Sequence, residues 1–211
     1  MRTFTKLAAA SAVALIATSG ISTSAQAHTN PTPGKTCEMS GTTTTVHGKT
    51  YICQQSGSKL IWGKGLPVSV SPLKVTDAWT KVASTGMSAT FGVIKNPTSA
   101  PITIVGAYSP YSPMDQLHEV VMKDGSMVMQ QKQGGFTIPA GGSMTLQPGG
   151  NHVMFMNLAR PVRAGALVPV TLTTSTGAQV TFKAVGKVFQ GGNETYVGAT
   201  PSPSGTTAMK M

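Results

Sequence analysis

Acidic residues are scarce in this sequence, which has six Asp and Glu residues and four His residues among 211. It also lacks a Gly-rich loop leading from a strand into a helix and the G-x-S-x-G motif of a nucleophile elbow. Glu119 follows His118 directly, but adjacent residues of a strand point to opposite faces, so we do not expect an acid–base pair. This shortage of catalytic groups argues against an enzyme.

Helical periodicity and long apolar runs are missing as well. Beyond the N-terminal segment no window shows a 3.6-residue apolar period, and no stretch approaches the roughly 20 apolar residues of a transmembrane helix. The formal net charge is +10, yet the Lys and Arg residues are scattered singly. A nucleic-acid-binding protein would gather them on one element beside stacking aromatic residues. We therefore expect no nucleic-acid partner and at most peripheral contact with an anionic membrane face.

Cysteine is limited to Cys37 and Cys53. An even number in an exported chain favours a disulfide, which would contribute about 3 kcal/mol by closing a loop of about 15 residues. Both cysteines lie far along the sequence from the region rich in His and Met. This separation argues against a blue-copper site, which needs a Cys thiolate beside its His and Met ligands.

Residues 1–27 are predicted to be a secretory signal peptide. Arg2 and Lys6 precede an apolar run from Leu7 to Ala17, and Ala25-Gln26-Ala27 fits the small-residue cleavage pattern. No Cys lies at the cleavage point, so we do not expect a lipid anchor there. The mature chain is expected in a periplasm or at the cell surface.

Three segments follow the predicted signal peptide. Residues 28–66 are predicted to form a linker and a small hairpin stapled by the disulfide. In residues 67–188 short β-prone runs alternate with turn signals such as Asp124-Gly125, which predicts an all-β sandwich or Greek-key barrel. Residues 189–211 are rich in Gly, Pro, Ser and Thr and are predicted to be a flexible tail.

Methionine is concentrated in one part of the sequence. Of the 12 methionines, seven lie between positions 114 and 156, namely Met114, Met122, Met127, Met129, Met144, Met154 and Met156. Most of them are expected to fill gaps in the core, the usual role of this side chain. His152, Met154 and Met156 alternate, however, so they would share one face of a strand.

A second group of soft ligands surrounds the predicted Asp124-Gly125 turn. Met127 and Met129 share a face of the strand after the turn, and a hairpin would bring His118 near them. Thioether sulfur and imidazole nitrogen together suit Cu(I). Zinc would favour Cys, His and carboxylate ligands, and calcium would favour oxygen. The residue types therefore predict a copper site.

Two segments of the chain resemble the signature of the periplasmic copper A chaperone (PCuAC) family. The first runs from Leu117 to Met129 (LHEVVMKDGSMVM), and the second comprises residues 138–142 (IPAGG) and 146–156 (LQPGGNHVMFM). The family pattern is a His, a Met about eleven positions later and a distant His-x-Met. Asp77-Ala78-Trp79 resembles the first-strand motif of the family. The resemblance covers about residues 68–187.

This resemblance implies a cupredoxin-like Greek-key barrel that binds one Cu(I). It also implies delivery of copper towards the copper A centre of cytochrome oxidase, in some cases beside a thiol-based partner. Carried over onto this sequence, the ligands are His118, Met129, His152 and Met154.

Two positions qualify this ligand set. Val120 stands where many family members have a second Met, which removes an auxiliary sulfur. Met127 shares a strand face with Met129 and is the candidate auxiliary ligand. A chaperone of this kind is expected to have a shallow, partly exposed site. The alternatives are an extracytoplasmic copper-buffering protein and an Ig-like surface module whose methionines all belong to the core.

Overall fold

The computed structural model describes residues 31–191 and the backbone of residues 195 and 196. The predicted signal peptide, and the predicted tail apart from residues 189–191, 195 and 196, lie outside the described residues. All regular elements in the described part of the chain are strands, which confirms the all-β prediction. The same part of the chain contains no helix long and apolar enough to cross a membrane.

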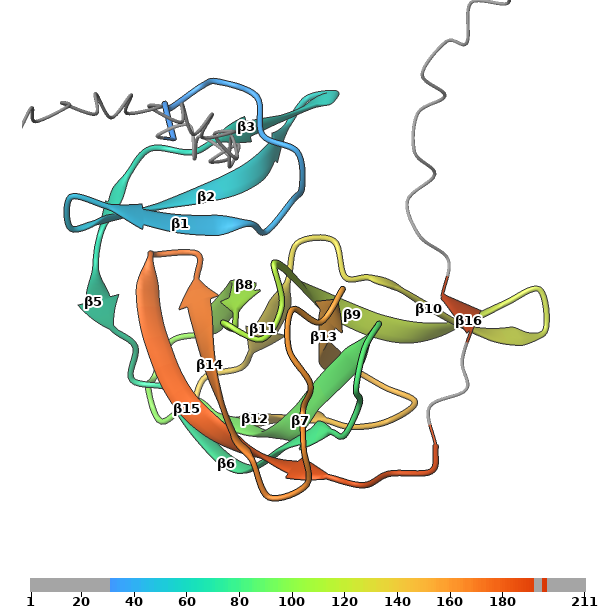
Figure 1. Cartoon of the computed structure of the whole chain (residues 1–211). Coiled ribbons are helices and arrows are strands. Elements are labelled where there is room, and N and C mark those ends of the chain that lie inside the picture. Colours follow the sequence, from blue (N-terminus) through green and yellow to red (C-terminus); the bar gives the residue numbers. More distant parts are fainter. Residues whose placement is uncertain (1–30, 192–194, 197–211) are drawn as a thin grey trace, which may run out of the picture.

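A small sheet forms the N-terminal unit, drawn in blue and cyan in Figure 1. It consists of β1 (Thr43–Val46), β2 (Lys49–Ser56) and β3 (Lys59–Trp62), with β4 (Leu66–Pro67) also pairing with β2. A disulfide joins Cys37 to Cys53, whose Cα atoms lie 5.9 Å apart. The structure thus extends the predicted cystine hairpin by a third strand.

The remaining strands form one large sheet. They are β5 (Ser69–Val70), β6 (Lys74–Lys81), β7 (Ser88–Lys95), β8 (Ile102–Tyr108), β9 (Met114–Lys123), β10 (Ser126–Gln131), β11 (Phe136–Ile138), β12 (Ser143–Leu146), β13 (His152–Met156), β14 (Leu167–Thr174), β15 (Ala178–Lys187) and β16 (Thr195–Tyr196). Their order is β11-β8-β14-β15-β6-β7-β13-β9-β10-β16, with β12 on β7 and β5 on β15. Chain neighbours such as β7 and β8, or β13 and β14, are therefore separated in the sheet.

The large sheet folds over a single main core. Ile104 and Phe136 from one end of the strand order pack in the same buried cluster as Ile94 and Phe155 from the other half. The sheet must curl to bring these side chains together, as Figure 1 shows. Alternation along each strand sends every second residue into this core and leaves the others for the opposite face.

The hairpin of β9 and β10 is closed by the predicted turn. Asp124 and Gly125 have φ values of 50° and 77°. Positive φ at both loop positions is typical of a two-residue type I′ turn, whose twist matches that of the flanking strands. The turn fixes the register between β9 and β10, and with it the position of Met129 relative to His118.

Candidate metal centre

The four predicted ligands lie on three adjacent strands, β13, β9 and β10. His152 of β13 stands directly opposite His118 of β9, and Met154 stands opposite Gln116. On the other side of β9, Met129 of β10 stands opposite Val120. Residues that face each other across strands share one face of the sheet. All four predicted ligands therefore lie on the same face.

The two histidines form the centre of this group. Their ring centroids lie 5.6 Å apart, with one ring edge directed at the other. His118 is 0% exposed and His152 is 3% exposed. Phe91 of β7 lies against the His152 ring, with 6.0 Å between the ring centroids. The pair is thus held within the protein rather than at its surface.

Hydrogen bonds set which nitrogen of each ring can bind a metal. The His152 Nδ1 donates to the Gly150 carbonyl at 2.9 Å, because a carbonyl can only accept. The His118 Nε2 donates to the Gln116 side-chain carbonyl at 2.7 Å for the same reason. The lone pairs are then on Nε2 of His152 and Nδ1 of His118. Metal-binding histidines are commonly oriented in this way, by a hydrogen bond from the ring nitrogen that does not bind the metal.

Burial keeps His118 neutral. Desolvation, together with the nearby positive charge that His152 can carry, lowers the pKa of His118 from 6.5 to about 4. At neutral pH the ring is therefore deprotonated, which is the form that binds metal.

The two thioethers lie beside the histidines in an apolar cluster. Met129 is 9% exposed and Met154 is 5% exposed, and both pack with Ala89 and Phe91. Met129, Met154 and His152 line a cavity of about 190 Å³. His118 does not line this cavity but contacts the His152 ring. The cavity is thus lined by three of the four predicted ligand residues, and the fourth adjoins it through the His152 ring.

Trp79 explains why the Asp77-Ala78-Trp79 motif accompanies the site. The pairing of β6 with β7 is interrupted between Thr76 and Trp79, and Asp77 has a φ of 54° in this irregular stretch. Such a bulge redirects the following side chain. The Trp79 ring then packs on Phe91, with centroids 4.4 Å apart, and against the cluster that contains both thioethers.

The site is more enclosed than the sequence led us to expect. Phe189 and Gly191, which follow β15, line the cavity together with Met87. The Phe189 ring lies 5.5 Å from the Trp79 ring, and the Lys81 ammonium donates to the Gly191 carbonyl at 2.6 Å. The expected shallow, partly exposed site is therefore not what the structure describes, because all four predicted ligands are at most 9% exposed and the chain after β15 adds to the wall of the cavity.

Met127, the candidate auxiliary ligand, lies apart from the cavity. It stands opposite Met122 near the tip of the hairpin and is 44% exposed. It shares the face of Met129 but does not line the cavity. Its auxiliary role stays a prediction.

Gln116 is the functional residue that sequence reasoning missed. It is 8% exposed and connects the N-terminal unit to the site, since its amide nitrogen donates to the Met39 sulfur at 2.7 Å while its carbonyl accepts from His118. A strand places residue i−2 on the same face as residue i, so the position of Gln116 relative to His118 was a usable signal. The contact with Met39 is long-range and had no local signal.

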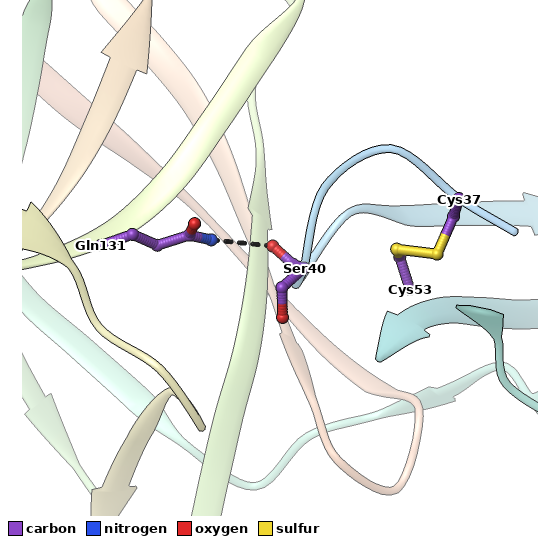
Figure 2. The surroundings of a disulfide bond; sticks show 4 residues. All are labelled: Cys37, Ser40, Cys53 and Gln131. Atoms are coloured by element: carbon purple, nitrogen blue, oxygen red, sulfur yellow. Dashed lines mark hydrogen bonds between the residues drawn. A yellow bond between two sulfur atoms is a disulfide. The ribbon is translucent and has the colours of Figure 1, made fainter. Parts of the chain in front are cut away.

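A second contact fixes the N-terminal unit on the other side of His118. Gln131 stands opposite His118 in the β9–β10 register, and its amide nitrogen donates to the Ser40 carbonyl at 2.8 Å. Figure 2 shows this bond beside the Cys37–Cys53 disulfide that staples the unit. The N-terminal unit is thereby anchored to Gln116 through Met39 and to Gln131 through Ser40, and both Gln residues adjoin His118 on the same face.

Replacing Gln116 with Leu should weaken Cu(I) binding roughly tenfold, the lower end of the loss in metal affinity when a ligand histidine loses its hydrogen-bond partner. The Leu side chain cannot accept the hydrogen bond that orients His118. The dissociation constant would be measured by competition with a chromophoric Cu(I) chelator. The matched control is Met39→Leu, which removes the other contact of Gln116 but keeps its bond to His118. Equal affinities of Gln116→Leu and the unchanged protein would contradict the positioning role.

Hard-metal ligands do not gather anywhere in the described part of the chain. No group of three or more His, Cys, Asp or Glu side chains there is placed to hold a metal ion. The soft donor set of two imidazoles and two thioethers is instead the composition that suits Cu(I).

Comparison with known proteins gives a family and several structural likenesses. The family model described as "Putative lipoprotein LpqE-like" matches residues 73–185. A relative named "Putative lipoprotein Lxx21020", from Leifsonia xyli subsp. xyli, is 44% identical over 126 residues, which span 60% of this chain and 76% of the relative. In this chain both cysteines are paired with each other in the disulfide.

Solved structures similar to this chain include PCuAC domains, the family that the sequence resembles. The copper-bound PCuAC domain from PmoF2 is 18% identical, with a TM-score of 0.47 over 57% of this chain and 97% of that domain. The Cu(I) form of DR1885 from Deinococcus radiodurans is 31% identical, with a TM-score of 0.44 over 59% of this chain and 84% of that chain. The family model and the relative together show that this chain belongs to the LpqE-like family.

Proposed function

We propose that this protein is an exported copper chaperone that binds one Cu(I) ion through His118, Met129, His152 and Met154. The observation that carries the proposal is the pairing of two buried imidazoles across β9 and β13, with two buried thioethers on the same face. Two imidazoles and two thioethers thus share one face of three adjacent strands, and both thioethers pack with the apolar residues Ala89 and Phe91. A structural core alone gives no reason to bury two facing histidines.

The chemistry of the ligands favours Cu(I) and permits its release. The two thioethers carry no charge, and the lowered pKa of His118 keeps that ring neutral at pH 7, so none of these three donors has to release a proton when the ion binds. Thioether sulfur keeps its affinity for Cu(I) where a thiol would be lost to disulfide formation. Neutral ligands hold the ion by donor bonds alone, so a competing set of ligands on an acceptor can replace them one at a time.

The proposed destination is the copper A centre of cytochrome oxidase, reached directly or through a thiol-based partner. The resemblance of residues 117–129 and 138–156 to the PCuAC signature supports this destination. Export is supported by the predicted signal peptide, by the Cys37–Cys53 disulfide and by a relative named as a lipoprotein. Under this proposal the protein carries copper and catalyses no reaction.

Transfer to an acceptor is the experiment that tests this function. The Cu(I)-loaded protein would be mixed with the apo copper A domain of a cytochrome oxidase, the two proteins separated, and the copper in each measured. We expect copper to move to the oxidase domain faster than from a small-molecule chelator of equal affinity. Tight binding without transfer would overturn delivery and favour the copper-buffering alternative.

A further inference from the structure

Two exposed methionines lie near the tip of the β9–β10 hairpin, which projects beyond the rest of the sheet in Figure 1. Met122 is 66% exposed and Met127 is 44% exposed. Packing in the core, the ordinary explanation for a methionine, does not apply to side chains with this much exposure. Neither residue lines the cavity of the proposed main site.

The hairpin geometry brings these two thioethers together. The Asp124-Gly125 turn is closed by Lys123 opposite Ser126, and the next pair along the ladder is Met122 opposite Met127. In a two-residue hairpin the closing pair exchanges hydrogen bonds, so the next pair does not, and its side chains lie closer. The two Cβ atoms of such a pair are about 5 Å apart. Two flexible thioethers at that spacing can bind one ion between them.

The pair lies on the same face as the main site. Met127 precedes Met129 by two residues, which is about 7 Å along a strand. On β9, Val120 lies between Met122 and His118 and packs against the cluster that contains Met129 and Met154. Lys123 belongs to the opposite face of β9, so the register places no positive charge beside the pair. A continuous row of soft or apolar side chains therefore connects the hairpin tip to the buried ligands.

We propose that Met122 and Met127 form a second, exposed Cu(I) site that captures the ion and passes it to Met129; this inference rests on the proposed function. Two thioethers bind Cu(I) more weakly than four ligands do, so the ion moves inward. The step is a ligand exchange in which a lone pair of the Met129 sulfur replaces one from Met127. The copper stays Cu(I), and no electron or proton is transferred. The pair also offers a surface entry point to a main site whose four ligands are at most 9% exposed.

A titration with Cu(I) under weak chelator competition tests the second site. The unchanged protein should bind one ion tightly and a further equivalent weakly. Met122→Leu/Met127→Leu should lose the weak equivalent, keep the tight one and load the main site several-fold more slowly. Met114→Leu is the matched control, because it removes an exposed thioether from the same face and leaves the hairpin pair intact. Thermal unfolding of each apo variant checks the fold.

A variant of the main site separates this inference from the proposed function. His118→Ala/Met154→Leu should lose the tight equivalent and keep the weak one. The hairpin site would be overturned if Met122→Leu/Met127→Leu bound the second, weakly held Cu(I) ion as the unchanged protein does. It would also be overturned if Met114→Leu lost that ion. Weak binding that depends on Met122 and Met127, in a protein that shows no tight site, would support the hairpin site and overturn the proposed function.

Discussion

Replacing His118 with Ala and Met154 with Leu together should weaken Cu(I) binding by more than about 100-fold. Loss of a hydrogen-bond partner of a ligand alone lowers metal affinity by up to about 100-fold, and this double variant removes two of the four ligands themselves. The two remaining ligands, Met129 and His152, come from strands on opposite sides of β9. Among the described residues that line the cavity, Met87 is the one other soft side chain that could replace a lost ligand.

The measurement is competition with a chromophoric Cu(I) chelator, with ascorbate as the reductant. A thiol reductant would compete for Cu(I) and would also reduce the Cys37–Cys53 disulfide. Met156→Leu is the matched control, since Met156 lies on the same strand and the same face and packs against the same cluster. It should bind Cu(I) as the unchanged protein does. Equal binding by the double variant would reject the assigned ligands and favour the metal-free surface module.

Strand alternation and one turn were enough to predict two spatial relations in the site, that of His152 to Met154 and that of Met129 to His118. Alternation along residues 152–156 predicted that His152 and Met154 share a face, and the structure has them so. The Asp124-Gly125 turn predicted the hairpin that places Met129 near His118. Both inferences rest on local rules, a period of two residues and a loop that requires positive φ.

The rest of the site depends on contacts that no local rule fixes. That β13 lies beside β9, with His152 opposite His118, is a pairing of strands more than 20 residues apart in the chain. The lining of the cavity by Phe189 and Gly191 brings the chain after β15 to residues of β7, β10 and β13. The contact between Gln116 and Met39 links β9 to the loop that precedes β1. From the sequence, only the resemblance to a known family could indicate that His152 and His118 come together. Nothing in the sequence indicated the position of Phe189 and Gly191 or the contact between Gln116 and Met39.

Replacing Phe155 with Ala should lower the free energy of unfolding by about 3–5 kcal/mol, as is usual for a buried Phe. Phe155 is 0% exposed and lies between Met154 and Met156 on β13. Because neighbours alternate, its ring points away from the ligand face and packs in the main core. The loss is a large part of the roughly 5–15 kcal/mol that holds a typical domain folded. Urea unfolding of the apo protein would measure it, and the loss would appear as a lower midpoint at constant slope.

Cu(I) binding should restore much of the stability that Phe155→Ala loses. Phe155 lies on the same strand as His152 and Met154 but points to the opposite face, so its loss should leave the ligands in place. A ligand that binds only the folded state, present at about 1,000 times its dissociation constant, adds about 4 kcal/mol to stability. Phe155→Ala loaded with Cu(I) should therefore unfold near the midpoint of the unchanged apo protein. Val70→Ala, at a residue that is 89% exposed, is the control and should change stability by no more than about 0.5 kcal/mol. Phe155→Ala could instead be destabilised as expected and gain no stability from Cu(I). That result would mean that the packing of Phe155 in the core also holds His152 and Met154 in position for the metal.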